Sequence, residues 1–221
     1  MGGVAHDQAS SGGADGIERV ESPVAGDADA LQRRLRFLVE ADRLKAVLRR
    51  TRLVDGSRHE NSAEHSWHLA LMAVLLADQA GAAVDLSRVL PMLLVHDVVE
   101  IDAGDTFCYD AGANLDKNAR ENAAAARLFG LLPEDDGRRL RALWDEFEAG
   151  ETDDARFAVA LDRMQPLLLN FHGGGGSWRE HGVKRAQVMR RIDPIRVGAP
   201  ALWPVVVGVI DRACEMGWIA P

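Results

Sequence analysis

Apolar residues recur every three or four positions along most of the chain, which is the spacing that places them on one face of an α-helix. The pattern begins with Leu31 and Leu35. Residues 1–28 are instead mostly Gly, Ala, Ser and Asp, so they bury too little apolar surface to offset the entropy of ordering. We therefore expect a disordered tail over 1–28 and a single domain over 29–221.

Two segments are apolar on nearly every side, as expected for helices at the centre of a bundle. The first runs from Ser62 to about Ala80 and starts with a residue type that caps helices. The second covers roughly 87–101 and follows a capping Asp85. Two consecutive buried helices predict a core made of helices.

The rest of the chain keeps the helical pattern, with clear interruptions. A stretch rich in Gly, Asp and Asn at 103–114 is typical of a loop. Pro166 should kink the helix that contains it. The strand-like run Val205 to Val207 follows Pro204, which argues against a central strand there. We predict an all-α fold, a helical bundle, with further helices over 116–129, 134–148, 152–171, 183–192 and 200–216.

Composition and charge exclude several classes of protein. The 26 Lys and Arg against 34 Asp and Glu give a net charge of −8, which argues against a broad surface for nucleic acid or anionic lipid. No apolar run is long enough to span a bilayer, and the N-terminus has no secretory signal. Cys108 and Cys214 are too few for a disulfide framework. We expect a cytoplasmic protein without nucleic-acid or membrane partners.

Five polar residues lie in or at the ends of the apolar helices: His65, His96, Asp97, Glu100 and Asp162. Unpaired ions would be costly to bury there. A single buried histidine is often a hydrogen-bonded core residue, and Asp162 could simply pair with Arg163. A divalent cation would satisfy the adjacent His96 and Asp97 together, with His65 and Asp162 as further ligands from other helices. The joint spacing favours the cation.

This spacing resembles a known family. His65, the His96-Asp97 pair and Asp162 reproduce the H…HD…D pattern of the HD-domain metal-dependent phosphohydrolases. The resemblance implies an HD-type helical domain with a metal site in its core.

The segments around these residues resemble one branch of that family more specifically. Residues 60–66 read ENSAEHS and residues 96–105 read HDVVEIDAGD. They are similar to the EN(x)xEHS and HDxxE(x)4D motifs of the 5'-deoxynucleotidase-like branch. The similarity is strongest from Arg50 to Asp105, and the residues beyond Asp162 add little support to it.

The resemblance assigns a role to each matching residue. It makes four residues the ligands of one metal ion: His65, His96, Asp97 and Asp162. Glu100 and Asp105 become the acidic pair that acts on water, leaving group or sugar, and Arg50 becomes the phosphate-binding arginine. Two imidazoles and two carboxylates suit Mn, Co, Fe or Zn better than Mg, which prefers oxygen ligands throughout. The resemblance also implies a homodimer.

One position departs from the family pattern. The residue after the phosphate-binding arginine is commonly Trp, which helps to exclude a ribose 2'-hydroxyl, whereas this chain has Thr51. We therefore expect ribonucleotides to be tolerated, unless another side chain such as Trp67 or Trp178 supplies the missing wall.

The function predicted on these grounds is metal-dependent release of phosphate from a nucleoside 5'-monophosphate, deoxy or ribo, or a similar small phosphate ester. A nucleotide pyrophosphatase or triphosphohydrolase using the same ion is the nearest alternative. An iron oxygenase of the same fold would need extra histidines, and none occurs between His96 and His172. A nucleotide sensor without turnover is disfavoured because all ligands and both acids are retained.

Overall fold

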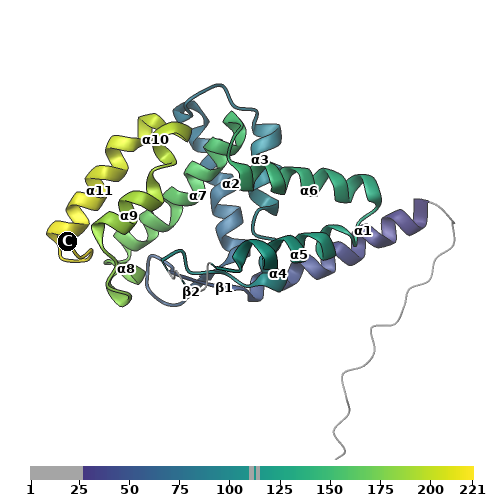
Figure 1. The fold of residues 1–221 in the computed structure, drawn as a ribbon, viewed down its shortest axis with the longest axis horizontal. Coiled ribbons are helices and arrows are strands. Elements are labelled where there is room, and N and C mark those ends of the chain that lie inside the picture. Colours follow the sequence, from purple (N-terminus) through teal and green to yellow (C-terminus); the bar gives the residue numbers. More distant parts are fainter. Residues whose placement is uncertain (1–26, 110–111, 113–114) are drawn as a thin grey trace, which may run out of the picture.

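The computed structural model of the chain describes residues 27–109, 112 and 115–221. These residues form a bundle of helices with one small hairpin of two strands (Figure 1). In chain order the elements are α1 Asp27–Ala41, η1 Asp42–Ala46, β1 Leu48–Arg52, β2 His59–Asn61, α2 Ser62–Leu76, η2 Ala77–Gln79, α3 Leu86–Val95, α4 Glu100–Ala103, α5 Lys117–Phe129, α6 Glu134–Ala149, α7 Asp153–His172, α8 Gly176–Glu180, α9 Arg185–Ile192, α10 Ile195–Gly198, η3 Pro200–Leu202 and α11 Trp203–Glu215. The prediction of an all-α bundle is confirmed.

Helix α7 runs through the middle of the molecule and contacts α2, α3, α6, α10 and α11 (Figure 1). It begins at the cap Thr152, whose side chain accepts a hydrogen bond from the Ala155 N–H. Phe157 and Leu161 are fully buried among the neighbouring helices. The helix continues through Pro166 to its end. Polar residues on α7 are therefore held inside the core by the apolar residues around them.

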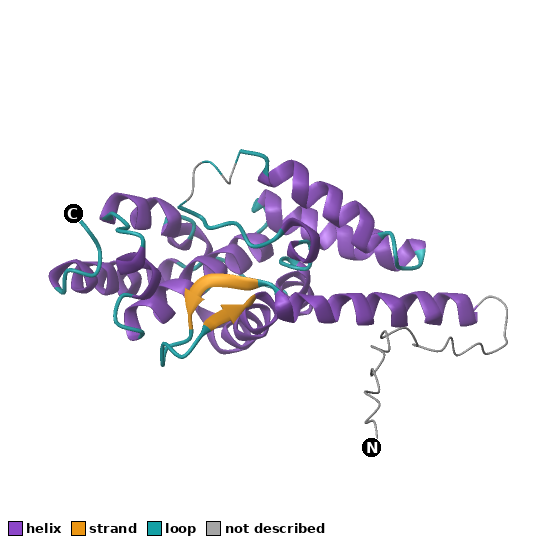
Figure 2. Cartoon of the chain, turned by 90° about the horizontal axis from the view of Figure 1, so that it is seen from below, coloured by secondary structure: helices purple, strands orange, loops and turns teal. Residues whose placement is uncertain are grey.

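The strands β1 and β2 form an antiparallel hairpin that the sequence pattern did not reveal (Figure 2). Leu48 pairs with Asn61 and Arg52 pairs with His59. The strand β1 contacts α7 and α8, so one of its faces is turned inward. Asn61 also caps α2, where its side chain accepts a hydrogen bond from the Glu64 N–H. The hairpin thus leads directly into the helix that carries His65.

The second apolar helix ends earlier than its pattern predicts. A continuous helix was expected over 87–101, but α3 ends at Val95 and α4 starts at Glu100. Between them the backbone makes tighter turns, in which the Glu100 N–H bonds to the Asp97 carbonyl, three residues back. The expectation of an unbroken helix is therefore wrong at this point, and the break changes the directions in which the residues after Val95 point.

The remaining differences are small. The short helices α8 and α10 were not expected, and the strand-like run at 205–207 lies inside α11. A tail was expected over 1–28. Residues 1–26 lie outside the described part of the chain, and α1 begins at Asp27.

Among the described helices, none combines the length and apolar character needed to span a membrane. Both cysteines are free thiols.

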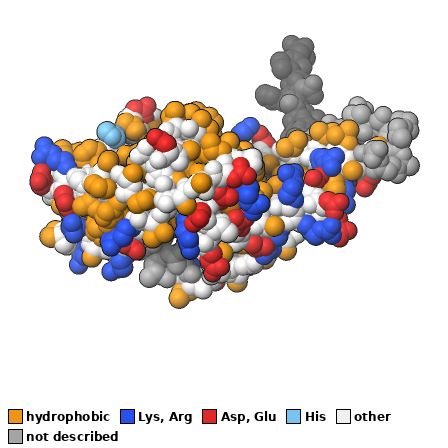
Figure 3. Space-filling view, turned by 90° about the horizontal axis from the view of Figure 1, so that it is seen from above, with side chains coloured by type: hydrophobic (Ala, Val, Ile, Leu, Met, Phe, Trp, Pro, Cys, Tyr) orange, Lys and Arg blue, Asp and Glu red, His pale blue; other side chains and the backbone are white. Residues whose placement is uncertain are grey.

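The surface mixes acidic, basic and apolar side chains on the face shown in Figure 3. One row of exposed apolar residues runs along α2, at positions i, i+4, i+7 and i+8: Trp67, Leu71, Val74 and Leu75. The homodimer and the single domain over 29–221 stay predictions.

The contact between α10 and α7 provides a test of packing. A Cβ added at Gly198 would lie 2.0 Å from the Arg156 carbonyl oxygen, which belongs to the backbone. We expect Gly198→Ala to lower the free energy of unfolding by about 1 to 3 kcal/mol, since the two helices would have to separate. Gly208→Ala on α11 is the control: a Cβ there meets nothing within 4 Å, and it should gain up to about 1 kcal/mol. Urea unfolding of both variants measures the difference, and equal stabilities would contradict the packing.

Candidate metal centre

Three helices bring two histidines and two aspartates together inside the bundle. His65 lies on α2, His96 and Asp97 follow the end of α3, and Asp162 lies on α7. One ligand atom from each of His65, His96 and Asp162 lies within 4.8 Å of the others. Asp97 lies beside this group, because its Oδ1 is 3.1 Å from His96 Nε2 and its Oδ2 is 3.9 Å from His65 Nε2. Three of the four predicted ligands therefore converge, and Asp97 as a fourth ligand stays a prediction.

The hydrogen bonds behind the two histidines turn the same ring nitrogen, Nε2, toward the carboxylates of the cluster, with His65 Nε2 2.9 Å from Asp162 Oδ1. His65 Nδ1 donates to Gln165 Oε1 at 3.0 Å, and His96 Nδ1 donates to the Leu93 carbonyl at 2.7 Å. Each neutral ring then has its lone pair on Nε2, which faces the cluster. His96 Nε2 is buried and makes no hydrogen bond. A cation that accepts both lone pairs fits this arrangement, and backing of each ligand by a hydrogen-bond acceptor is usual at metal sites.

Electrostatics in the cluster follow from burial and from close opposite charges. Burial and the charge of Arg49 lower the pKa of His65 to about 4, which keeps this imidazole neutral at pH 7. Burial acts in the same direction on His96, but Asp97 outweighs it and raises the pKa of His96 to about 9. His96 and Arg49 in turn hold the pKa of Asp97 well below its usual range despite burial. Since a cation and a proton compete for His96 Nε2, binding of the ion should release a proton.

The two acids assigned to catalysis lie beside the cluster. Glu100 is buried, and its Oε2 accepts a hydrogen bond from Ser62 Oγ at 2.6 Å. Burial and the neighbouring Asp97 raise the pKa of Glu100 well above its usual range. Burial also raises the pKa of Asp105, which accepts a hydrogen bond from the Arg50 backbone N–H. Because the chain breaks after Val95, Glu100 reaches the cluster from α4 rather than from one continuous helix face.

Comparison with known proteins agrees with this geometry. A family description that reads "HD domain" matches residues 41–203, which is most of the chain. The chain belongs to the HD-domain family. The two predicted features of the resemblance, the fold and the family, are thereby confirmed.

Individual relatives of this HD domain carry related descriptions. A solved structure described as a predicted metal-dependent phosphohydrolase from Magnetospirillum magnetotacticum MS-1 is 53% identical, with a TM-score of 0.83, and the match covers 87% of this chain and 100% of that one. A conserved hypothetical protein from Pyrococcus furiosus shares the fold, with 18% identity and a TM-score of 0.61 over 79% of this chain and 98% of that one.

Curated relatives match the HD domain over a shorter stretch. The mouse protein 5'-deoxynucleotidase HDDC2 is 31% identical over 135 residues, which are 61% of this chain and 66% of that protein. The human protein of the same name is also 31% identical, over 61% of this chain and 65% of its own length. The match thus spans slightly less than two thirds of these relatives.

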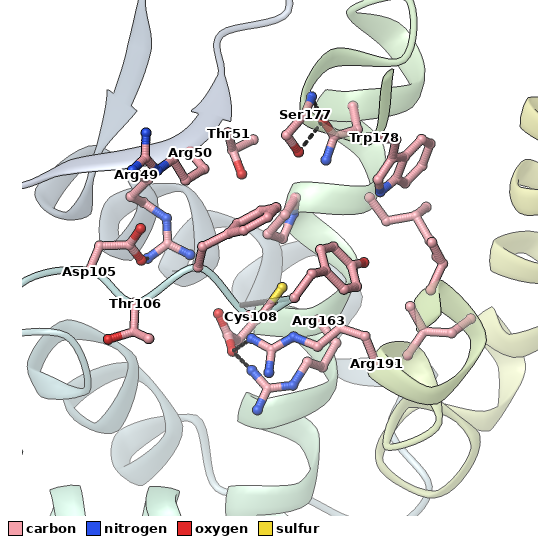
Figure 4. A pocket seen from close by; sticks show the side chains of 18 residues that line it. Arg49, Arg50, Thr51, Asp105, Thr106, Cys108, Arg163, Ser177, Trp178 and Arg191 are labelled. Atoms are coloured by element: carbon pink, nitrogen blue, oxygen red, sulfur yellow. Dashed lines mark hydrogen bonds and ion pairs between the residues drawn. The ribbon is translucent and has the colours of Figure 1, made fainter. Parts of the chain in front are cut away.

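The two arginines of β1 differ in their surroundings within the HD domain. Arg50, to which the resemblance assigned the phosphate, is exposed, although it borders the pocket. Arg49 points to the opposite side, where its Nη1 donates to Asp97 Oδ2 at 2.7 Å and lies 3.8 Å from Asp105 (Figure 4). The Nε of Arg49 is buried and has no hydrogen-bond partner. Of Arg49 and Arg50, Arg49 is therefore the one that contacts a candidate metal ligand, Asp97.

A pocket opens beside the HD cluster and reaches from β1 to α9 (Figure 4). Thr51 lies in its wall and is buried, on the same side of β1 as Arg49. Trp178 also lines it, and its ring N–H donates to the Tyr109 hydroxyl. Trp67 is 64% exposed on α2 and does not line the pocket. Of the two tryptophans considered as a substitute wall, only Trp178 is placed to act as one.

Sequence reasoning gave no role to Gln165 or Glu60, which both belong to this site. Gln165 connects His65 to Glu60: its Oε1 accepts a hydrogen bond from His65 Nδ1, and its Nε2 donates to Glu60 Oε1 at 2.6 Å. Glu60 was visible as part of the motif at 60–66 but had no role. Gln165 follows Asp162 by three residues in a helix, so a polar residue one turn after a ligand was the available signal.

The metal centre predicts a defined metal content. We expect one divalent ion per chain, and His96→Ala should lower that content at least tenfold, because the ring nitrogen that lacks a hydrogen bond is removed. His172→Ala, at the exposed end of α7, is the matched control and should keep its metal. Elemental analysis of the purified proteins gives the result. Two ions per chain, or full metal content in His96→Ala, would contradict the assignment.

Proposed function

We propose that this HD-domain protein is a metal-dependent phosphohydrolase that releases phosphate from nucleoside 5'-monophosphates, deoxy or ribo, or from similar small phosphate esters. The observation that carries the proposal is that Nε2 of His65 and Nε2 of His96 both face the carboxylates of Asp97 and Asp162, with the buried carboxyl of Glu100 nearby. The names of the curated relatives, which are 5'-deoxynucleotidases, support the substrate class.

Glu100 and Asp105 would have different roles in hydrolysis. A bound divalent ion would activate water and neutralise phosphate charge. Water attacks the phosphorus, the bond from phosphorus to the ester oxygen breaks, and the leaving oxygen takes up a proton. Glu100, whose pKa is raised by burial and by the neighbouring Asp97, is suited to supply that proton. Asp105, held by the Arg50 backbone N–H, is suited to orient the attacking water.

Strand β1 supplies the two arginines that are candidates to bind the phosphate. The Nε of Arg49 is a buried donor that makes no hydrogen bond and lies 3.7 Å from Glu60 Oε2, and a phosphate oxygen would satisfy it. Arg50 borders the same pocket from the exposed side and remains the residue that the resemblance implies. We assign the closer contact to Arg49, because its guanidinium already lies among the acids that would surround the reacting phosphate.

The role of Glu100 can be separated from metal binding. Glu100→Gln preserves shape and the contact with Ser62 but removes the acidic proton, so we expect metal content to persist while kcat falls about a hundred- to ten-thousand-fold. Asp102→Asn on the same short helix is the control, since Asp102 is exposed and pairs with Arg127 away from the pocket. Phosphate release and metal analysis are measured on both. Loss of metal together with activity would make Glu100 a ligand instead.

Sugar preference depends on Thr51. A threonine in the pocket wall leaves room for a 2'-hydroxyl, so the wild-type protein should accept AMP and dAMP with similar kcat/KM. Thr51→Trp should favour dAMP by about ten- to two-hundred-fold, because the indole would fill the space of the hydroxyl. Thr51→Val, which keeps the shape, is the control, and thermal unfolding checks that each variant folds. A wild-type preference for dAMP above about a hundredfold would show that another wall, such as Trp178, excludes ribose.

A further inference from the structure

The Asp162 carboxylate faces two different environments. Its Oδ1 lies 2.9 Å from His65 Nε2 and 4.0 Å from His96 Nε2, on the side of the candidate metal. Its Oδ2 accepts a hydrogen bond from Arg163 Nη1 and lies 4.0 Å from Arg191 Nη2. A single carboxylate oxygen therefore faces two guanidinium groups from different helices, α7 and α9.

Those two arginines carry more positive charge than their surroundings neutralise. Among the described residues, neither Arg163 nor Arg191 has a second carboxylate within 4.0 Å. Asp162 would share its own charge with a metal ion, which leaves less of it for the arginines. Arg163 is also largely buried, with a side chain 20% exposed, so water compensates it only in part. An anion from outside the chain would complete the balance.

The arginines lie where a substrate could reach them. Both line the same pocket as Arg49 and Thr51. Figure 4 shows Arg163 and Arg191 side by side below Cys108, on the opposite side of the pocket from Thr51. The pocket thus has one cationic group at β1 and another between α7 and α9. A substrate with a single phosphate would occupy the first and leave Arg163 and Arg191 with Asp162 as their one carboxylate among the described residues.

We propose that Arg163 and Arg191 form a second anion subsite, and that the substrate of this pocket carries a second phosphate group besides the one that is hydrolysed. Two guanidinium groups together offer the paired donors that suit a phosphate. The second phosphate could be on the 5' chain, as in a nucleoside diphosphate, or on the sugar, as in a nucleoside 3',5'-bisphosphate. This inference rests on the proposed function for the nature of the first phosphate. The alternative is that the arginines serve only to hold Asp162.

Kinetics on matched substrates test the subsite. We compare kcat/KM for AMP, ADP and adenosine 3',5'-bisphosphate, and expect at least a tenfold preference for one of the two doubly phosphorylated compounds. Which of them it is shows where the second phosphate lies. Arg191→Gln should lower that preference by about 10- to 100-fold, the usual cost of a lost charged hydrogen bond. Arg185→Gln, on the same helix but paired with Asp211, should leave the preference unchanged.

The same variants separate the subsite from a structural role. If Arg191→Gln slowed all three substrates equally, or lost its metal, Arg191 would act through Asp162 and the proposal would be wrong. Absence of any preference in the wild-type protein would also overturn it.

Binding without turnover separates this inference from the proposed function. We titrate the purified protein with methylphosphonate and with methylenediphosphonate, neither of which is hydrolysed, and follow the heat of binding. The diphosphonate should bind at least tenfold more tightly to the wild type, and Arg191→Gln should remove most of that difference, which attraction to the metal alone would not explain. If no phosphate ester is hydrolysed but this pattern holds, the proposed function fails and the subsite stands. Equal affinities, or a difference insensitive to Arg191→Gln, would exclude a second phosphate adjacent to the first. Equal affinities together with no preference for adenosine 3',5'-bisphosphate over AMP would refute the subsite.

Discussion

The structure depends on burying two imidazoles and two carboxylates where α2, α3 and α7 meet. Removing such groups from water is costly, and the cost is met only when each polar atom has a partner. Most atoms of the cluster have one, but His96 Nε2 makes no hydrogen bond and has only the nearby carboxylate of Asp97, with Oδ1 at 3.1 Å. A divalent ion would satisfy it and would also balance the carboxylates. The helical bundle supplies apolar walls that fix the four side chains, so the chemistry and the packing cannot be changed independently.

A second layer of polar residues holds this cluster in place. The chain from His65 through Gln165 to Glu60 sets which ring nitrogen carries the proton. Burial raises the pKa of Glu60 to about 7, and Arg49, 3.7 Å away, acts against that rise. Arg49 therefore contacts both layers, which explains why a charged residue is tolerated on the inward face of a strand.

Much of this could be predicted from the sequence, and the failures have physical causes. Helices with long apolar patterns and the ligand residues on them were predictable, because burial imposes the period of 3.6 residues. The hairpin was not predictable, since β1 reads LRRTR. Its inward and outward positions are both occupied by arginines, so the sequence shows no alternation of apolar and polar residues. The break after Val95 was also missed, because Val98, Val99 and Ile101 continue the apolar pattern across the turns. Arg191 lies far along the chain from the motifs and only tertiary packing brings it to the pocket.

The pairing of β1 in the hairpin determines which of its side chains face the site. Because successive residues of a strand point to opposite sides, a shift of β1 by one position would exchange Arg49 for its neighbour and move Thr51 out of the pocket wall. The turn at 53–58 lies outside this constraint, whereas β1 already has an irregular register between Leu48 and Arg52. Natural variation in length should therefore concentrate in the turn between the two strands, which carries none of the side chains in the pocket wall.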